Sequence, residues 1–449
     1  MNRLKPVFVG WILAAVFLPG CALFRPPMVH PKTPVEEVKR QIHRGGSSEL
    51  TVGVAKVEIT PPVGTPLAGY SKRHGQPSTG IRDPLYLRVL ALSDGEDLVV
   101  VVSADILVYP HPWAQELIEK LSKEFKIPRQ AFILCATHTH SGTGSIAQGF
   151  LHEQVFGPYR SQVVDGIAGR LEFAVRQAIE HRHPVRWALA SNKHLLNGLI
   201  ENRMNPSGFI DPSMSVLLFE SPEGKPEAML VSAAAHPTLM DSQDLRISAD
   251  YPGELTQVME TTYPGAVCLF VNGAAGDLRP RDAVGLNSDE RIIRFGKALA
   301  EGATGLINQA NLRAKGDVAA WGWTVPLPPP QFSIGPIPIH PSIMRLARPS
   351  SAFLNLCALD EVILVPLPVE LTTEYGQNLR VKLSAQGNQP IVIGYANGYL
   401  GYAVTPQQYE GKSYEAWMTW YGPNFGASVA EEIWLLAALY PSKEASNKP

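Results

Sequence analysis

The fold is indicated best by one segment of the sequence, Ala131-Phe132-Ile133-Leu134-Cys135-Ala136-Thr137-His138-Thr139-His140-Ser141-Gly142-Thr143-Gly144. Its apolar first half is typical of a buried strand, and its second half is typical of a turn at the edge of a sheet, where open α/β sheets bind ligands. Strand side chains alternate, so we expect His138 and His140 to share a face. Neutral imidazole is the commonest protein ligand of metals, so the pair indicates a metal site; a hydrogen-bonded polar cluster is the alternative.

Strand and helix patterns alternate on both sides of this segment. Apolar runs typical of strands cover residues 98–103, 131–137, 187–190, 214–219, 228–235, 266–271, 362–367 and 391–395. Patterns typical of helices cover residues 113–125, 159–181, 253–262, 290–308, 371–385 and 427–440. The alternation predicts an α/β fold, a layered domain with a mostly parallel or mixed sheet flanked by helices. The proline-rich stretch 326–349 is predicted to be a long surface loop, because proline lacks the N–H donor that a central strand needs.

A series of further motifs extends from about residue 50 to residue 440. They are Val52-Gly53-Val54 through Thr60-Pro61-Pro62 with Gly69-Tyr70, Thr137-His138-Thr139-His140-Ser141-Gly142, Glu201-Asn202-Arg203 with Asp211-Pro212, His236-Pro237-Thr238, Ser248-Ala249-Asp250-Tyr251-Pro252-Gly253, Asn272-Gly273-Ala274-Ala275-Gly276-Asp277, Glu370-Leu371-Thr372-Thr373, Asn397-Gly398-Tyr399-Leu400-Gly401-Tyr402, and Tyr409-Glu410 with Tyr414-Glu415. In this order they resemble the neutral, non-lysosomal ceramidase family, whose His-Thr-His-Ser-Gly-Pro element has Thr143 here in place of proline. The resemblance implies one ceramidase-like catalytic domain over residues 51–440.

The resemblance also implies a zinc ion held by two histidines, one glutamate and one tyrosine. Carried onto this sequence, these ligands are His138, His236, Glu370 and Tyr402. All four offer nitrogen or oxygen donors that zinc accepts at about 2.0–2.2 Å, and a bound dication favours the ionised phenol. Tyr399 is a rival for the tyrosine, and the match of the neighbouring motif residues to the family pattern assigns Tyr402.

Each ligand also has a structural interpretation. His236 follows an apolar run and would serve as a hydrogen-bonded histidine at a strand end. Glu370 precedes a helical pattern, where a carboxylate is favourable through the helix dipole alone. Tyr402 would be a packed tyrosine of the core.

Three further positions match family residues around the reacting group. His140 would point into the same pocket as His138 and act as a general acid or base. Arg203 and Tyr414 match residues that contact the reacting group. Their structural alternatives are a loop histidine bonded to backbone, a surface ion pair and a packed aromatic ring.

Arg279 marks a departure from the family. Ceramidases carry Gly-Asp-Val-Ser-Pro-Asn, with the serine regarded as catalytic, where this chain has Gly276-Asp277-Leu278-Arg279-Pro280-Arg281. A guanidinium has no lone pair for nucleophilic attack, so hydrolysis would use metal-activated water. Arg279 would then bind an anionic group of the substrate, or form a structural ion pair with Asp277 or Asp282.

The composition is that of an ordinary enzyme. The 449 residues include 39 Lys and Arg against 41 Asp and Glu, which gives no basic field for nucleic acid. No internal repeat is visible, and the oligomeric state is not predicted.

The N-terminus predicts export. Basic residues precede an apolar segment and Cys21, as in a lipoprotein signal peptide over residues 1–21, with an uncleaved anchor as the alternative. Cys21 would become a lipid anchor in the bacterial cell envelope, at the outer membrane or facing the periplasm. Residues 22–50 are predicted to be a flexible tether, and residues 441–449 a tail.

Two functions follow from these patterns. The first is an envelope-anchored zinc-dependent hydrolase that cleaves the amide bond of a ceramide-like N-acyl lipid or a related substrate. The second is a non-catalytic lipoprotein that binds a lipid or glycan in the inherited pocket.

Overall fold

The computed structural model describes residues 35–39, 41–42, 49–281, 284–334, 337–339, 348–411 and 413–440. The predicted signal peptide, Cys21, most of the tether and the tail lie outside these residues. Within the described part of the chain, no helix is both long and apolar enough to cross a membrane.

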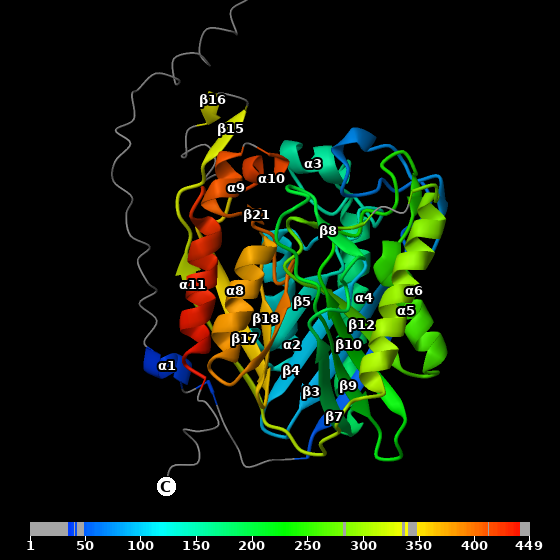
Figure 1. Cartoon of the computed structure of the whole chain (residues 1–449), viewed down its shortest axis with the longest axis vertical. Helices are drawn as coiled ribbons and strands as arrows, with labels where there is room; N and C mark the ends of the chain where they lie inside the picture. The colour runs from blue at the N-terminus through cyan, green and yellow to red at the C-terminus, as the bar shows by residue number, and fades with distance from the viewer. Residues whose placement is uncertain are drawn as a thin grey trace, which may run out of the picture.

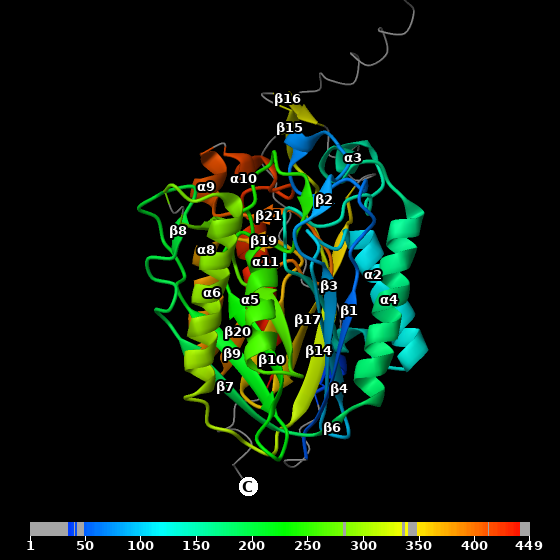
Figure 2. The ribbon, with the colours of Figure 1, turned by 90° about the vertical axis from the view of Figure 1, so that its right-hand side faces the viewer.

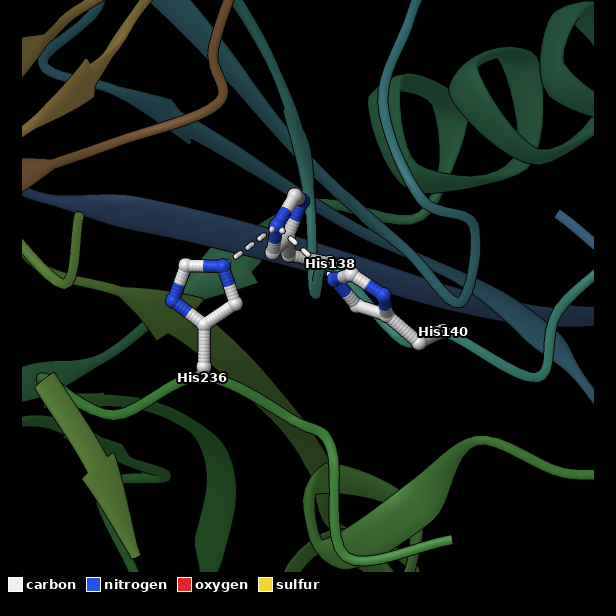
Figure 3. A group of neighbouring side chains, drawn as sticks. All are labelled: His138, His140 and His236. Atoms are coloured by element: carbon white, nitrogen blue, oxygen red, sulfur yellow. Dashed lines mark hydrogen bonds between the residues drawn. The ribbon is translucent and has the colours of Figure 1, made fainter. Parts of the chain in front are cut away.

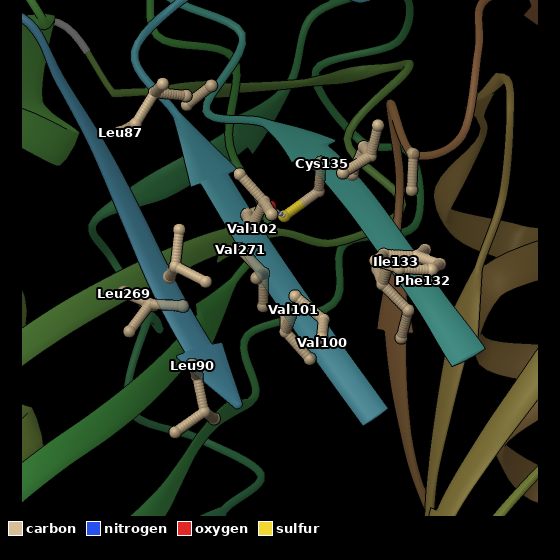
Figure 4. Close-up of a cluster of buried hydrophobic side chains, with 14 of the residues drawn as sticks. Leu87, Leu90, Val100, Val101, Val102, Phe132, Ile133, Cys135, Leu269 and Val271 are labelled. Carbon is tan, nitrogen blue, oxygen red and sulfur yellow. Dashed lines mark hydrogen bonds between the residues drawn. The ribbon is translucent and has the colours of Figure 1, made fainter. Parts of the chain in front are cut away.

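The first of three large sheets holds the segment that opens the sequence analysis. Its strand order is β5-β4-β3-β1-β6, with β1 (Thr51–Glu58), β3 (Tyr86–Ser93), β4 (Leu98–Ala104), β5 (Phe132–Ala136) and β6 (His183–Pro184). Only β4 and β5 run parallel, and α2 (His111–Phe125) joins them. The long helix α4 (Ser161–Glu180) packs against β1 and β3. Figure 4 shows side chains of β3, β4 and β5 buried against Leu269 and Val271 of the second sheet.

The second sheet has the order β12-β10-β9-β7, with β7 (Arg186–Asn192), β9 (Met214–Glu220), β10 (Pro226–Ala233) and β12 (Val267–Asn272). Here β10 and β12 are parallel and are joined by α5 (Asp250–Thr262). Helix α6 (Ser288–Ile307) lies beside α5 and covers the same face, as Figure 2 shows.

The third sheet has the order β14-β17-β18-β20, with β14 (Val318–Pro326), β17 (Ser351–Leu359), β18 (Val362–Pro366) and β20 (Gln389–Ile393). Its parallel pair is β18 and β20, joined by α8 (Thr373–Ser384), and α11 (Phe425–Ala437) packs on α8 (Figure 1). Mixed sheets flanked by helices confirm the predicted fold class.

The three sheets repeat one connection. Each has three antiparallel strands in succession, then a helix, then a fourth strand parallel to the third at one edge of the sheet. The third and fourth strands of each sheet therefore end at the same edge, as strands of β-α-β units do. The sequence shows no such repeat, because a shared topology requires a shared hydrophobic pattern and not shared residues.

Short helices and strands lie outside the three large sheets and their helices. They are α1 (Val35–Lys39), η2 (Ser71–Arg73), β2 (Gly80–Ile81), η3 (Arg129–Ala131), α3 (Phe150–Phe156), β8 (Ile200–Asn202), β11 (Arg246–Ile247), β13 (Leu278–Pro280), β15 (Phe332–Ile334), β16 (Ile337–Ile339), β19 (Glu370–Leu371), β21 (Tyr402–Ala403), α9 (Pro406–Glu410) and α10 (Tyr414–Trp417). The stretch 326–349 is not the plain loop that was predicted, because β15 and β16 pair as a hairpin. A separate two-stranded hairpin tolerates Pro338, since both strands are edges.

Candidate active site

The candidate site forms where the strands of the three sheets end. His138 follows β5, His236 follows β10, and Glu370 follows β18. Tyr402 reaches the site because β19 and β21 pair in parallel with Glu370 opposite Tyr402. His138 has a φ of 70°, a left-handed conformation that turns the chain directly after the strand.

The donor atoms of these residues converge. The Nε2 atom of His138 lies 3.2 Å from Nε2 of His236 and 3.3 Å from Nε2 of His140, as Figure 3 shows. The Oε2 atom of Glu370 lies 3.1 Å from Nε2 of His236 and 3.5 Å from Nε2 of His138. The Tyr402 hydroxyl lies 3.4 Å from Nε2 of His236. Ligands on a tetrahedral ion with bonds of about 2.0–2.1 Å are about 3.3 Å apart, so the spacing fits zinc.

The far sides of both imidazoles are held by backbone. Nδ1 of His138 lies 2.8 Å from the carbonyl of Leu107, and Nδ1 of His236 lies 2.8 Å from that of Ala275. Each Nδ1–H donates to its carbonyl, which leaves the Nε2 lone pair for a metal, as in histidine ligands generally. Burial, with the nearby Arg203 cation, lowers the pKa of His236 to about 4, which keeps its ring neutral.

Glu370 supplies an unsatisfied acceptor. Its side chain is buried and its Oε2 atom accepts no hydrogen bond. Burial raises the pKa of Glu370, but the imidazoles of His138 and His236 hold it well below its ordinary value. Carboxylate and imidazole donors that converge in a buried position are well placed to hold a cation between them. The donor set therefore fits a divalent metal ion.

Tyr399 and Tyr402 have different partners. The Tyr399 hydroxyl donates to Oε1 of Glu370 at 2.6 Å and so orients the carboxylate. The Tyr402 hydroxyl accepts from Nη2 of Arg203 at 2.8 Å. Burial raises the pKa of Tyr402 well above its ordinary value, and Arg203 opposes that shift.

Arg203 links the site to α10. Its Nη2 atom also donates to the carbonyl of Gly276 at 2.8 Å, and its Nε lies 3.1 Å from Oε1 of the buried Glu415. Tyr414, next to Glu415, is 57% exposed, and its ring centroid lies 6.0 Å from that of Tyr402. The structure therefore brings all of the predicted ligands, Arg203 and Tyr414 into one region.

His140 lies beside the ligands with one nitrogen unused. Its backbone carbonyl accepts from the buried Arg73, and its ring packs against Tyr70 with centroids 4.9 Å apart. Its Nδ1 atom is buried and makes no hydrogen bond. Burial lowers the pKa of His140 well below its ordinary value, and His138 and His236 add to the effect.

Arg279 lies apart from this cluster. It alternates with the buried Leu278 and Pro280 along β13, so its side chain is 46% exposed and lies 2.7 Å from Oε1 of Glu201. The ion-pair alternative predicted Asp277 or Asp282 as the partner. Asp277 instead accepts from Thr373 and Asn202, and Asp282 lies outside the described residues. Arg279 is absent from the described lining of the cavity, and its predicted contact with substrate stays a prediction.

A cavity of about 410 Å³ opens at the cluster. Its described lining consists of Gly69, Leu107, Val108, Pro110, His111, Pro112, His138, His140, Ala147, His152, Val155, Phe156, Arg348, Pro349, Glu370, Tyr399, Tyr402, Tyr414, Met418 and Trp420. Most of these side chains are apolar, and none is serine, threonine or cysteine.

Several residues at the cavity or beside the cluster were missed by sequence analysis. Tyr395 stacks on His138 with ring centroids 3.8 Å apart, and its place just beyond the end of β20 was a signal that went unused. Arg73, His111, His152 and Arg348 come from loops or helix ends far apart in the sequence, and no local pattern marks them.

The comparisons with known proteins agree with the family that the motifs resemble. The family model described as neutral/alkaline non-lysosomal ceramidase, N-terminal, matches residues 50–290, more than half of the chain. The neutral ceramidase of Pseudomonas aeruginosa is 24% identical over 245 residues, which cover 51% of this chain and 36% of that protein. The neutral ceramidase of Drosophila melanogaster is 34% identical over 77 residues, 16% of this chain and 11% of that protein.

Solved structures agree on the fold. The crystal structure of the Pseudomonas aeruginosa neutral ceramidase superposes with a TM-score of 0.77 at 20% identity, over 88% of this chain and 75% of that chain. A structure titled ceramidase complexed with C2 gives a TM-score of 0.77 at 18% identity, over 88% of this chain and 76% of that chain. The predicted family is confirmed: this chain belongs to the neutral/alkaline non-lysosomal ceramidases.

Proposed function

We propose that this protein is a zinc-dependent hydrolase that cleaves the amide bond of a ceramide-like N-acyl lipid or a related substrate. One observation carries the proposal. At the cavity, Oε2 of Glu370 lies 3.1 Å from Nε2 of His236 and 3.5 Å from Nε2 of His138, and the Nδ1 atoms of both rings are held by backbone carbonyls. Donor atoms that converge in this way suit a divalent cation, and zinc is the ion that this set of nitrogen and oxygen ligands suits.

His138, His236, Glu370 and Tyr402 would hold the zinc ion. When bound, zinc supplies a Lewis acid and lowers the pKa of a coordinated water to about 7. Arg203 stabilises the ionised form of Tyr402 through its hydrogen bond to the phenol oxygen. Tyr399 keeps the carboxylate of Glu370 in position.

We assign proton transfer to His140. Its ring is neutral and its Nε2 atom lies 3.3 Å from Nε2 of His138, so the ring would be placed to accept a proton from the attacking water and return it to the leaving amine. Tyr414 reaches the cavity with a hydroxyl that would donate to the oxygen of the amide as negative charge develops there.

Water is the nucleophile in this proposal. Among the described cavity residues there is no hydroxyl or thiol nucleophile of the serine, threonine or cysteine type. Arg279, at the position of the family serine, has no lone pair and is paired with Glu201.

The substrate and location follow from the cavity and the N-terminus. A largely apolar cavity suits an acyl chain, and the curated relatives are named neutral ceramidases. We place the protein in the bacterial cell envelope, anchored by lipid at Cys21. A non-catalytic protein that binds a lipid or glycan is the second candidate, because the described lining of the cavity contains no serine, threonine or cysteine.

Elemental analysis of the purified chain tests the proposal. We expect about one zinc per chain, lost in His138→Ala and in His236→Ala and kept in His181→Ala, an exposed histidine of the same type. A folded wild type that takes up no metal from supplied zinc would refute the hydrolase. Metal uptake without cleavage of any N-acyl substrate, beyond that of the metal-free control, would favour the binding protein.

A further inference from the structure

Arg348 places a cation in the apolar part of the cavity. Its guanidinium lies over the ring of the buried Trp420, with Cζ 3.4 Å from the ring centroid. Its Nη1 atom lies 3.1 Å from Nε2 of His152, and its Nε atom is buried without a hydrogen bond. Among the described residues, this one hydrogen bond leaves most of the five N–H donors of the arginine without an acceptor.

The neighbours of Arg348 do not neutralise it. His152 donates from Nδ1 to the carbonyl of Gln148, so its Nε2 accepts from Arg348 as a neutral ring. The nearby phenols of Tyr399 and Tyr421 donate to Glu370 and to the carbonyl of Pro349. Burial lowers the pKa of Arg348 to about 10, which shows that its surroundings disfavour the charge.

Two other arginines at this end of the molecule have more acceptors than Arg348, although the Nε atom of Arg203 also makes no hydrogen bond. Arg73 donates to the hydroxyl of Ser141 and to five carbonyls, those of Ala68, His140, Asp241, Ser242 and Asp244. Arg203 pairs with Glu415 and donates to Tyr402 and Gly276. Among the described cavity residues, the single carboxylate is that of Glu370, which faces the imidazoles.

We propose that Arg348 is a subsite for an anionic group, and that the natural substrate of this protein is an acidic N-acyl amphiphile. The apolar walls would bind its acyl chain, and the guanidinium would bind a carboxylate or a phosphate in the bidentate geometry that arginine favours. The reaction assigned to this substrate rests on the proposed function, but the binding of an anionic amphiphile does not.

Calorimetric titration with three ligands that share a ten-carbon chain tests the subsite. The probes are 1-decanol, decanoate and decyl phosphate, none of which contains an amide to be cleaved. We expect an anionic probe to bind wild type about tenfold to a hundredfold more tightly than 1-decanol. The comparison of decanoate with decyl phosphate distinguishes a carboxylate from a phosphate substrate.

Arg348→Gln should abolish this preference and leave the affinity for 1-decanol within about twofold. The matched control is Arg176→Gln, which removes an exposed arginine paired with Glu124 and should keep the preference. Equal affinity of wild type for all three probes would overturn the inference, and so would an unchanged preference in Arg348→Gln. If that variant fails to fold, Arg348→Lys keeps the charge without the planar fork, and an unchanged affinity for both anions would count against the subsite.

The two proposals can fail separately. A chain without zinc or amidase activity that still prefers anionic probes through Arg348 would refute the hydrolase and keep the subsite. A zinc enzyme that cleaves neutral N-decanoylethanolamine as well as N-decanoylglycine, with KM values unchanged in Arg348→Gln, would keep the hydrolase and refute the subsite.

Discussion

Two groups of residues at the same cavity contain buried polar atoms without hydrogen-bond partners, and the two groups would attract ligands of opposite charge. Around His236 and Glu370, acceptor atoms face one another without a donor. Around Arg348 and Trp420, a donor is buried without an acceptor. Buried polar groups normally find partners in the protein, so an unmet group in a cavity indicates what the cavity binds. The comparison predicts a cation at the first group and an anion at the second.

The two groups also differ in how firmly they are held. Each imidazole of the first group is fixed by a backbone carbonyl, and Glu370 is fixed by Tyr399. Arg348 has one histidine and the face of one ring. A metal needs ligands fixed in position, whereas a flexible arginine can adapt to substrates of different length.

The largest effect is expected for His140, which lies beside the four proposed ligands but is not itself assigned as a ligand. His140→Gln should lower kcat by about a hundredfold to ten-thousandfold and keep about one zinc per chain, because a general acid or base is lost while the four ligands stay. Steady-state kinetics and elemental analysis on the same preparation check both parts. Loss of zinc in this variant would make His140 a ligand, in line with its place in the three-histidine group.

Removal of the Tyr399 hydroxyl tests how the carboxylate of Glu370 is held in position. Tyr399→Phe should weaken zinc binding by about tenfold to a hundredfold, because Glu370 loses the hydrogen bond that orients it. Competition with a chelating dye measures the affinity. Tyr263→Phe, at the end of α5 and away from the cavity, is the control and should bind zinc as wild type does. Equal affinity in both variants would contradict an orienting role for Tyr399.

His111 lies in the same lining and makes stability depend on pH. Burial, with Arg129, lowers its pKa to about 4 from an ordinary value near 6.5. The folded state then binds fewer protons than the unfolded state between these values, so stability is lost as the pH falls from about 6.5 towards 4. Between pH 7 and pH 4.5, His111→Gln should lose about 2 kcal/mol less unfolding free energy than wild type.

Urea unfolding at the two pH values measures this difference. Exposed His181 is the control, and its replacement by glutamine should leave the pH dependence of wild type unchanged. Parallel pH curves for wild type and His111→Gln would show that His111 is not held neutral by burial.

Sequence reasoning located the elements whose apolar runs are continuous. Strand β5 was predicted because every residue from Phe132 to Ala136 is buried and apolar. Strand β14 was missed, because small residues interrupt its apolar pattern. In β17, the buried amide of Asn355 donates to the carbonyl of Gln130 in η3 and to that of Phe132 in β5, a strand of another sheet. A contact between distant segments leaves no local signal.

The same limit applies to the site. The motif order pointed to the ligands, since each follows a predicted strand or matches a family motif. Spacing alone does not decide between Tyr399 and Tyr402, because both hydroxyls reach the cluster and only their partners differ. Arg348 was out of reach for a different reason. Arg348 is singled out by its lack of hydrogen-bond acceptors. That lack can be recognised only from the structure of its described neighbours.

The smallest effect is expected for Arg279, an arginine that contrasts with Arg348. Its guanidinium is half exposed and already paired with Glu201, so it has no unmet charge to offer a ligand. Exposed ion pairs contribute about 0–1 kcal/mol, so Arg279→Ala should lower the unfolding free energy by less than about 1 kcal/mol and change KM by less than about twofold. Kinetics with N-decanoylglycine check this. A large rise in KM would restore the substrate-binding role that the sequence predicted, and would remove the distinction between a paired surface arginine and an unpaired one in the cavity.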